Sequence, residues 1–282
     1  RINRRQRQMC IRDRISGIAW DHINVFPTFE NYKNQFSIFL DSIVNGGSIT
    51  YNEEDSEVRQ LVEYNENPIR RFPYKTAEFR IVDGVTYLET DEGPIPLEIF
   101  GAHNLNNLAG AKWICQHMGI DEMDFYEAVV SFSGASKRLE KIASHKSTVV
   151  FKDFAHAPSK VSATTAAVKH QYPHKRLLAC LELHTYSSLN ESFLKEYKNT
   201  LDKADEAVVF YSPKALEIKH MKPLKPEQIS MAFEHPNLKV CSDPLAFQTL
   251  LKNQSYTNSV LLLMSSGNYG GLNFDQLKNI IL

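Results

Sequence analysis

Two patterns of apolar residues divide the chain, and each predicts a different arrangement of elements. From residue 147 onward, short apolar runs alternate with segments that have helical spacing. Strands are predicted at residues 147–154, 176–183, 206–211, 238–241 and 259–266, and helices at residues 158–172, 191–201, 225–233, 244–253 and 273–282. Uniformly apolar strands between helices indicate a parallel sheet covered on both faces. We therefore predict a Rossmann-like domain whose ligands bind at the carboxyl ends of the strands.

The residues before position 147 mix short strands with helices. Apolar residues at helical spacing predict a helix over residues 29–44, which the sequence Asn-Gly-Gly then stops. The other predicted elements are strands at residues 16–26, 48–51, 78–82, 85–89 and 95–99 and helices at residues 104–118 and 123–132. Asp83-Gly84 between two of these strands is a hairpin signal. We place the domain boundary near residues 144–147.

Composition narrows the class of protein. A chain of 282 residues predicts about two domains, and 43% hydrophobic residues exclude a disordered chain. The longest apolar run, Val260–Met264, is far too short to cross a bilayer. A net charge of -1 gives no global electrostatic case for nucleic acid or membrane. Four widely spaced cysteines with no C-x-x-C favour buried thiols in a reducing compartment over disulfides or a zinc site.

The first fourteen residues have an unusual composition. They hold six arginines and one aspartate and carry a charge of +5, and they contain no apolar stretch of a signal peptide. One interpretation is a basic arm for RNA or anionic lipid. We favour a non-native artefact of translated adapter sequence and leave residues 1–14 out of the fold prediction. The chain would then be the C-terminal part of a longer protein, and it contains neither a phosphate loop nor a G-x-G-x-x-G motif.

Three candidate sites lie before the predicted domain boundary. Asp21-His22 forms either a turn hydrogen bond or a cation site, where His22 would suit zinc better than magnesium. Residues 101–107 open a helix, and their three asparagines either cap it or read the edge of a purine; a helix N-terminus also attracts phosphate. Arg138 beside Lys137 is either a solvated cation or a clamp for a phosphoryl oxygen.

Three further candidates follow predicted strands of the second domain. Asp153 ends the first of them, where it either caps the next helix or accepts hydrogen bonds from ribose hydroxyls. His156 is a candidate for phosphate binding or acid–base chemistry. Residues 182–188 and 265–271 follow two other strands, and the second, Gly-rich loop exposes backbone N–H groups suited to an anion. A plain strand-to-helix turn is the alternative for both loops.

The order of these segments resembles the Mur ligases, ATP-dependent enzymes that form amide bonds in peptidoglycan assembly. The resemblance runs from residue 15 to residue 282. The segments that carry it are DHINVF at 21–26, GAHNLNN at 101–107, SKRLE at 136–140 and KDFAHAPSKVSAT at 152–164. Each motif is weak alone, and their order and spacing together are specific. The missing G-x-G-x-x-G argues against an ordinary dehydrogenase.

The resemblance implies a fold and a function. It implies an α/β chain in which residues 15–145 are the C-terminal part of the central ATPase domain. Residues 146–282 would be the Rossmann-like C-terminal domain with a mostly parallel sheet. The implied enzyme is a carbon–nitrogen ligase of peptidoglycan recycling in the bacterial cytoplasm. It would join UDP-N-acetylmuramate to L-Ala-γ-D-Glu-meso-diaminopimelate through an acyl phosphate, and the segments FAH and MSSGNYGGL favour this donor.

Two alternatives remain open. One is the family member that adds a single L-alanine to UDP-N-acetylmuramate. The other is a non-catalytic nucleotide-binding paralogue. It is favoured by Ala19, Lys152 and Ala157, which replace a glutamate, the first of two aspartates and a histidine of the family's motifs. Since the chain lacks a phosphate loop, we expect these 282 residues alone to be inactive.

The resemblance also implies cofactors, partners and residue roles. ATP and Mg²⁺ would be the cofactors, and UDP-N-acetylmuramate and a cell-wall peptide the partners, with no nucleic acid and no membrane insertion. His22 would hold magnesium, and His22 and Arg138 would be the catalytic residues. The implied ATP-binding residues are His103, Asn104, Asn107, Arg138, Asp153 and His156. The implied peptide-binding residues are His184, Ser187, Ser266 and Asn268.

Overall fold

The boundary between the two halves of the chain lies earlier than expected. A computed structural model of the chain describes residues 13–145, 147–274 and 277. It separates two compact units, which divide between Ser133 and Gly134. Residues 134–145, which we expected in the first domain, lie in the second unit. The reason is an unpredicted strand, β7 (Glu140–His145), which pairs with the first predicted strand of the second domain.

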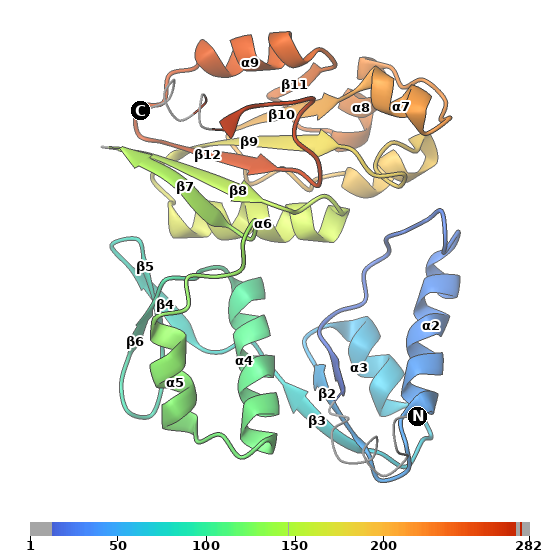
Figure 1. Cartoon of the computed structure of the whole chain (residues 1–282), viewed down its shortest axis with the longest axis vertical. Coiled ribbons are helices and arrows are strands. Elements are labelled where there is room, and N and C mark those ends of the chain that lie inside the picture. Colours follow the sequence, from blue (N-terminus) through green and yellow to red (C-terminus); the bar gives the residue numbers. More distant parts are fainter. Residues whose placement is uncertain (1–12, 146, 275–276, 278–282) are drawn as a thin grey trace. The chain divides into compact units, whose positions relative to one another are not determined.

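The first unit contains a three-stranded parallel sheet with helices packed on it (Figure 1). The strands have the order β1 (Asp13–Ile15), β2 (Ser48–Asn52), β3 (Arg70–Tyr74). Two helices, α2 (Phe29–Ser42) and α3 (Ser56–Glu63), complete this part. Leu40 from α2, Ile49 from β2 and Val58 from α3 are fully buried in one apolar cluster. The apolar residues whose spacing predicted α2 therefore form the face of the helix that packs on the sheet.

The predictions for this part were partly right. The helix predicted over residues 29–44 is confirmed as α2, although α3 and β3 were missed. The strand predicted over residues 16–26 is wrong, because β1 ends at Ile15. Beyond it, the Ile18 N–H donates to the Asp55 carboxylate at 3.0 Å instead of to a neighbouring strand. That bond draws the chain out of the sheet toward the start of α3, which Asp55 also caps.

Arg14 is part of the fold, so leaving residues 13 and 14 out of it was wrong. Its Nε and Nη2 donate to the Tyr74 hydroxyl at 3.1 and 2.9 Å, and Nη2 also donates to Asn107 Oδ1 at 2.9 Å. The guanidinium carbon lies 5.1 Å from the centroid of the Tyr74 ring. A Cβ added at Gly110 would lie 2.4 Å from Arg14 Nε, so the side chain is seated against the helix backbone. Residues 1–12 lie outside the part that the structure describes.

A hairpin sheet and two helices form the rest of the first unit (Figure 1). The elements are β4 (Phe79–Val82), β5 (Val85–Leu88), β6 (Ile95–Leu97), α4 (Ala102–His117) and α5 (Glu122–Val130). Asp83 and Gly84 connect β4 to β5 with φ values of 50° and 77°, which confirms the hairpin predicted there. Leu88, Leu105 and Phe125 are buried together between this sheet and the two helices.

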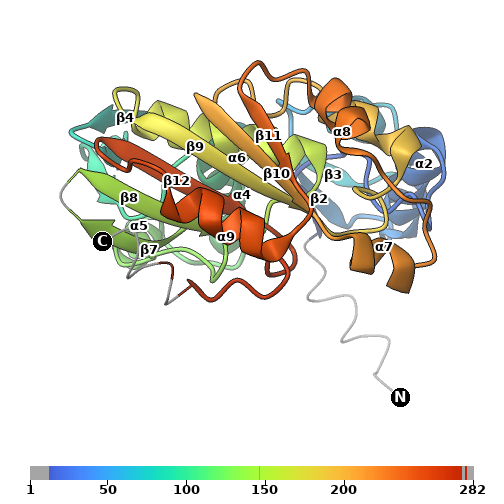
Figure 2. The same ribbon diagram turned by 90° about the horizontal axis from the view of Figure 1, so that it is seen from above.

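A six-stranded sheet organises the second unit. Its order is β11-β10-β9-β12-β8-β7, and the five strands other than β7 are parallel. Their bounds are β8 (Thr148–Asp153), β9 (Arg176–Leu183), β10 (Glu206–Tyr211), β11 (Leu238–Cys241) and β12 (Ser259–Met264). These are the five predicted strands, and the mostly parallel sheet is confirmed. The last strand, β12, is inserted between β8 and β9 (Figure 2).

Helices cover both faces of this sheet. They are α6 (Pro158–Gln171), the 3₁₀ helix η1 (Glu191–Tyr197), α7 (Pro213–Ile218), α8 (Pro226–Phe233) and α9 (Pro244–Lys252). Helix α9 lies on the face opposite α6 (Figure 1). The connections from β8 to β11 run across the sheet in one direction, and the connection from β11 back to β12 runs in the opposite direction. Because crossover connections are right-handed, the helix of this last connection, α9, must lie on the other face of the sheet. The helix predicted over residues 191–201 is a shorter 3₁₀ helix, and most of the one predicted over residues 273–282 lies outside the described residues.

The predicted burial of the thiols holds for one of the three described cysteines, whereas Cys115 and Cys241 are only partly buried. Cys115, Cys180 and Cys241 are free, and Cys180 is fully buried. Burial raises the pKa of the Cys180 thiol well above its ordinary value, and it also raises that of Cys241. Within the described ranges, no helix combines the length and the apolar character that crossing a bilayer requires.

The contact between Arg14 and Gly110 makes a prediction about stability. In the wild-type chain, Gly110→Ala should lower the free energy of unfolding by about 1–3 kcal/mol, because the new methyl group displaces the arginine. In an Arg14→Ala background the same change should be neutral or stabilising by up to about 1 kcal/mol, since alanine favours a helix interior more than glycine does.

Urea titration of the four variants measures this non-additivity. Arg59→Ala, on the exposed face of α3, is the control and should change stability by less than about 0.5 kcal/mol. Equal costs of Gly110→Ala in both backgrounds would show that Arg14 does not occupy this position.

Candidate functional site

The candidate residues of the second unit lie along one edge of the six-stranded sheet. Asp153 ends β8, Leu183 ends β9 and Met264 ends β12, and these parallel strands are neighbours (Figure 2). The segments that follow them, residues 154–157, 184–190 and 265–271, therefore leave the sheet at the same edge. In a parallel α/β sheet this edge is where ligands bind. We take it as the candidate site of this unit.

Asp153 has its carboxylate directed inward, with partners on both oxygens. Its side chain is buried, with 7% of the residue exposed. Oδ2 accepts from the Leu139 N–H at 2.7 Å, and Oδ1 accepts from the Ala155 N–H at 2.6 Å and the Thr164 hydroxyl at 3.4 Å. The N-cap of α6 is Ala157, so Asp153 does not cap this helix. A buried charge requires such partners, and here they join the chain before β7 to the end of β8.

Arg138 lies at the surface on the segment that Asp153 holds. It is exposed, and among the described residues its guanidinium has no hydrogen bond and no ion pair. Its neighbours Lys137 and Leu139 have φ values of 58° and 47°. Those values belong to the left-handed region, which residues with a Cβ rarely adopt. The result is an exposed cation on a sharply bent segment, which suits the predicted contact with a phosphoryl group.

His156 is buried at the turn that follows β8. Its Nδ1 lies 2.9 Å from the Phe154 carbonyl oxygen. The ring also meets the Phe154 ring edge to face at 5.2 Å between centroids. The Tyr197 hydroxyl donates to the His156 carbonyl and anchors this turn from η1. The structure thus fixes His156 beside Asp153 at the site edge, with its ring packed against the chain.

Glu182 is a buried carboxylate in this site; the sequence analysis included it in the segment 182–188 but gave it no role of its own. It is 2% exposed and lies one residue before the end of β9. Its Oε2 accepts from the Ser265 hydroxyl and from the Tyr269 N–H, the latter at 2.8 Å. The Ser265 oxygen in turn accepts from the Gly267 N–H at 2.7 Å. Glu182 therefore ties the end of β9 to the Gly-rich loop after β12.

His184 stands at the exposed end of this arrangement. Its side chain is 41% exposed, and Nδ1 lies 3.7 Å from Glu182 Oε1. A Cβ added at Gly267 would lie 2.8 Å from Glu182 Oε2 and 3.0 Å from His184 Cγ. The loop can approach this pair so closely only because residue 267 is glycine. The predicted peptide-facing histidine is thus held beside a buried acid, and its outer edge is open to solvent.

The remaining predicted peptide contacts differ in accessibility. Ser187 is buried, with 4% exposed, inside a turn that Thr185 and Ser188 close by hydrogen bonds. Asn268 is exposed, and its Oδ1 accepts from the Gly271 N–H at 3.1 Å. Ser266 has a buried hydroxyl oxygen with no hydrogen-bond partner among the described residues. Such an oxygen is costly to leave unpaired.

In the first unit, the asparagines of α4 already have partners within the chain. The helix begins two residues before the predicted start, with Gly101 as its N-cap, so Asn104 is not the cap. Asn104 Nδ2 donates to the Phe100 carbonyl at 2.9 Å, and Asn107 Oδ1 accepts from Arg14. Buried Asn106 donates to Asn52, Glu54 and Thr76. These bonds use Asn104 Nδ2 and Asn107 Oδ1, so the other amide atoms, Asn104 Oδ1 as an acceptor and Asn107 Nδ2 as a donor, are left to bond a ligand.

His103 and His22 complete the predicted set. His103 follows Ala102 in the first turn of α4 and is half-buried. His22 is exposed, and its N–H donates to Asp21 Oδ1 at 2.7 Å, which is the turn hydrogen bond of our first interpretation. Its φ is 55°. Among the described residues, no group of three or more His, Cys, Asp or Glu side chains is placed to hold a metal ion.

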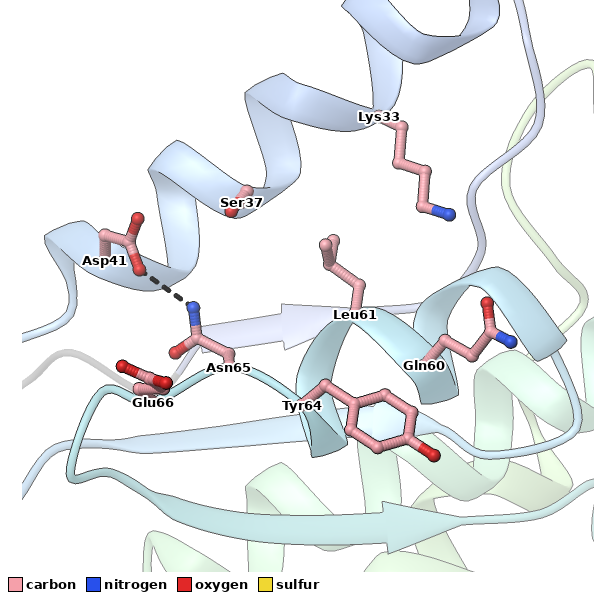
Figure 3. A pocket seen from close by; sticks show the side chains of 8 residues that line it. All are labelled: Lys33, Ser37, Asp41, Gln60, Leu61, Tyr64, Asn65 and Glu66. Carbon is pink, nitrogen blue, oxygen red and sulfur yellow. Dashed lines mark hydrogen bonds between the residues drawn. The ribbon is translucent and has the colours of Figure 1, made fainter.

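A separate groove of about 450 Å³ lies between α2 and α3 (Figure 3). Lys33, Asp41 and Tyr64 are among its lining residues, and Asn65 Nδ2 donates to Asp41 Oδ1 at 2.8 Å across it. None of the predicted site residues lines it. The groove is therefore not part of the candidate site that the sequence indicated.

Comparison with known proteins agrees with this geometry in the second unit. Residues 137–267 match the family described as Mur ligase, glutamate ligase domain. The UDP-N-acetylmuramate–L-alanine ligase of Caldicellulosiruptor saccharolyticus is 30% identical over 207 residues, which are 69% of this chain and 45% of that protein. The enzyme of the same name from Carboxydothermus hydrogenoformans is 25% identical over 280 residues, 93% of this chain and 59% of that protein. The chain thus spans about half the length of the curated relatives it matches.

Solved structures show the same fold. A murein peptide ligase from Psychrobacter arcticus superposes with a TM-score of 0.61 at 17% identity, covering 95% of this chain and 58% of that one. MurF from Acinetobacter baumannii gives a TM-score of 0.67 at 14% identity, covering 95% and 58%. The fold is therefore that of the Mur ligases, as the sequence predicted. Within the chain, residues 137–267 are the part that matches the Mur ligase, glutamate ligase domain.

The hydrogen bonds of Glu182 predict unequal effects of two substitutions. Glu182→Ala should lower the free energy of unfolding by about 2–4 kcal/mol, because Ser265 and the Tyr269 N–H lose their buried acceptor. Glu182→Gln should cost less than half as much, since its carbonyl oxygen can still accept both bonds while its amide group faces His184.

Denaturant titration measures both changes. The control is Glu206→Ala, which breaks a half-exposed ion pair with Arg176 at 2.9 Å and should cost no more than about 1 kcal/mol. Equal losses from Glu182→Ala and Glu182→Gln would contradict the assignment of Glu182 as an acceptor for the loop.

Proposed function

We propose that the complete gene product containing these residues is an ATP-dependent ligase of peptidoglycan precursors. It joins the carboxylate of UDP-N-acetylmuramate to the amino group of an amino acid or peptide. The observation that carries this proposal is the match of residues 137–267 to the Mur ligase glutamate ligase domain. The same residues contain the Arg138 bend, Asp153 and the loop after β9 at the ligand edge of the sheet.

The chemistry explains why such a site needs a fixed cation. A carboxylate is a poor electrophile, so ATP first transfers its γ-phosphoryl group to it and leaves ADP. The donor amine then attacks the acyl phosphate, and the tetrahedral intermediate expels phosphate as the amide bond forms. Both steps bring anions together, and positioning with charge neutralisation supplies most of the rate. We assign this neutralisation to Arg138, whose guanidinium is exposed on a bend held by the chain.

The asparagines of α4 support a role in nucleotide binding. Asn104 and Asn107 are three residues apart on the same face of the helix. Their internal bonds leave one amide oxygen and one amide nitrogen for a ligand. An adenine edge presents an amino donor beside a ring-nitrogen acceptor, which is the complementary pair. We therefore propose these two residues, with His103 beside them, as the adenine contacts.

The described residues do not by themselves form the magnesium site that the resemblance implied. His22 supplies a nitrogen ligand, whereas Mg²⁺ prefers oxygens, and Asp21 beside it accepts from the His22 N–H. No group of three acidic, histidine or cysteine side chains is placed together in residues 13–145 and 147–274. We assign no step of the reaction to a metal held by His22.

The identity of the amino donor separates two versions of this function. We propose the recycled tripeptide L-Ala-γ-D-Glu-meso-diaminopimelate, which is supported by the segments at residues 154–156 and 264–272 and by the fold shared with a murein peptide ligase over 95% of the chain. Free L-alanine is the second candidate, because the relatives above are named UDP-N-acetylmuramate–L-alanine ligases.

A non-catalytic paralogue is the third candidate, and Ala19, Lys152 and Ala157 favour it. Lys152 replaces the first acid of a pair in the family, and its Nζ lies 3.8 Å from the centroid of the Phe274 ring. Burial and the nearby Lys137 lower the pKa of Lys152. Residues 152 and 153 alternate on β8 and so point to opposite faces of the sheet, which leaves Asp153 in place. The replacement therefore does not remove the acid that holds the Arg138 bend.

The test is substrate-dependent release of ADP by the complete gene product. ADP should form only when ATP, UDP-N-acetylmuramate and the amino donor are all present, and kcat/KM should be at least tenfold higher for the tripeptide than for L-alanine. Arg138→Ala should lower kcat by about 100-fold or more, because it removes a charge that acts in the transition state. Lys137→Ala is the control and should change kcat by less than threefold.

Each failure has a distinct meaning. A higher kcat/KM with L-alanine would replace our donor by the second candidate. ATP binding without turnover for any donor would favour the paralogue.

A further inference from the structure

The bend that carries Arg138 has a backbone conformation that needs support. Lys137 and Leu139 both have positive φ values, 58° and 47°, and both have a Cβ that this conformation crowds against the following carbonyl. Neither position is glycine, so the sequence does not make the bend favourable on its own. Residues in such conformations persist when their surroundings hold them.

The surroundings that hold this bend belong to β8, the strand beside β7 (Figure 1). The Leu139 N–H donates to Asp153 Oδ2 at 2.7 Å, and the Phe154 N–H donates to the Lys137 carbonyl at 2.7 Å. The Leu139 side chain is itself buried, with 8% exposed. Both residues at positive φ are thus bonded to consecutive residues at the end of β8.

Asp153 is held from its other side as well. Oδ1 accepts from the Ala155 N–H at 2.6 Å and from the Thr164 hydroxyl on α6 at 3.4 Å. The turn after β8 and helix α6 therefore fix one oxygen of the carboxylate, while the other oxygen accepts from Leu139. Two separate donors approach two separate oxygens, which an aspartate satisfies and an asparagine cannot, because its amide nitrogen would face one of the N–H groups.

We propose that Asp153 is a positioning residue for Arg138. Its buried carboxylate holds residues 137–139 in the left-handed conformation and so fixes the direction in which the exposed guanidinium leaves the surface. This inference rests on the proposed function for the role of Arg138, and it gives Asp153 a different role from the ribose contact that the resemblance implied. The conformational part of the inference stands on the hydrogen bonds alone.

The first experiment measures the bend in the chain itself. Asp153→Ala should accelerate hydrogen exchange at the Phe154 amide at least tenfold, because the bond from this amide to the Lys137 carbonyl exists only while the bend is held. Asp205→Ala is the matched control, since Asp205 accepts from the Leu177 N–H at 2.7 Å at the opposite edge of the sheet. It should leave the Phe154 amide unchanged.

A second variant distinguishes positioning from general damage to the fold. Lys137 is exposed, and glycine adopts positive φ without strain, so Lys137→Gly should favour the bend without the help of Asp153. In the Asp153→Ala background it should restore most of the lost protection of the Phe154 amide. No acceleration in Asp153→Ala, or no recovery on adding Lys137→Gly, would overturn the proposal.

The second experiment uses ADP formation by the complete gene product. Asp153→Ala should lower kcat by about the same factor as Arg138→Ala, and the double variant should be no slower than Arg138→Ala alone. Adding Lys137→Gly to Asp153→Ala should recover at least tenfold in kcat. Factors that simply multiply in the double variant would overturn the proposal, because they would show that Asp153 acts independently of Arg138.

Nucleotides lacking a ribose hydroxyl separate the two roles of Asp153. If Asp153 positions Arg138, 2′-deoxy-ATP and 3′-deoxy-ATP should change KM by the same factor in the wild type and in Asp153→Ala. A penalty in the wild type that disappears in Asp153→Ala would make it a ribose ligand and overturn our assignment. Absence of any ligase activity would refute the proposed function, and the exchange experiment would still decide the inference about the bend.

Discussion

Two carboxylates, buried at the ends of β8 and β9 on either side of β12, set the geometry of the second unit. Removing a charge from water is costly unless it is hydrogen-bonded, so Asp153 and Glu182 must collect N–H and hydroxyl donors around them. The donors come from loops: the segment before β7 for Asp153, and the loop after β12 for Glu182. Each acid thereby converts a flexible connection into a fixed one. The need of the two buried acids for hydrogen-bond donors therefore orders this edge of the sheet. The exposed Arg138 lies on the segment bonded to Asp153, and the exposed His184 lies beside Glu182.

The sequence predicted the second unit more completely than the first. Strands such as RLLACLEL and SVLLLM are apolar on both faces, and this pattern has few interpretations other than a buried parallel strand. In the first unit, β3 has the sequence RRFPY and α3 has only eight residues, so neither shows enough periodicity to be recognised. Strand β7 was missed for a similar reason: EKIASH is polar because it lies at an edge, with four exposed residues.

The sequence predicted that the candidate residues lie at the carboxyl edge of the sheet, but it did not predict the hydrogen bonds among them. From the rule that ligands bind at the carboxyl edge we expected Asp153 and the two loops at this edge, and the structure has them there. The rule could not reveal that Asp153 turns inward, since that depends on the positive φ of Leu139, fourteen residues earlier in the chain. Glu182 had a detectable signal, a lone acid inside an apolar strand, because such a residue is rarely buried without a purpose. The partners of Asn107 were hidden by the decision to set Arg14 aside.

The position of β7 has a practical consequence for anyone who wishes to study the second unit in isolation. A fragment beginning at residue 146 would leave the apolar strand TVVFKD with an unpaired edge, and it would also discard the residue whose amide pairs with Asp153. Exposed, flat, apolar edges recruit other chains and form aggregates. A fragment beginning at Gly134 retains the protecting polar strand, so the natural starting point for expressing this unit lies a full strand upstream of where the helix–strand alternation begins.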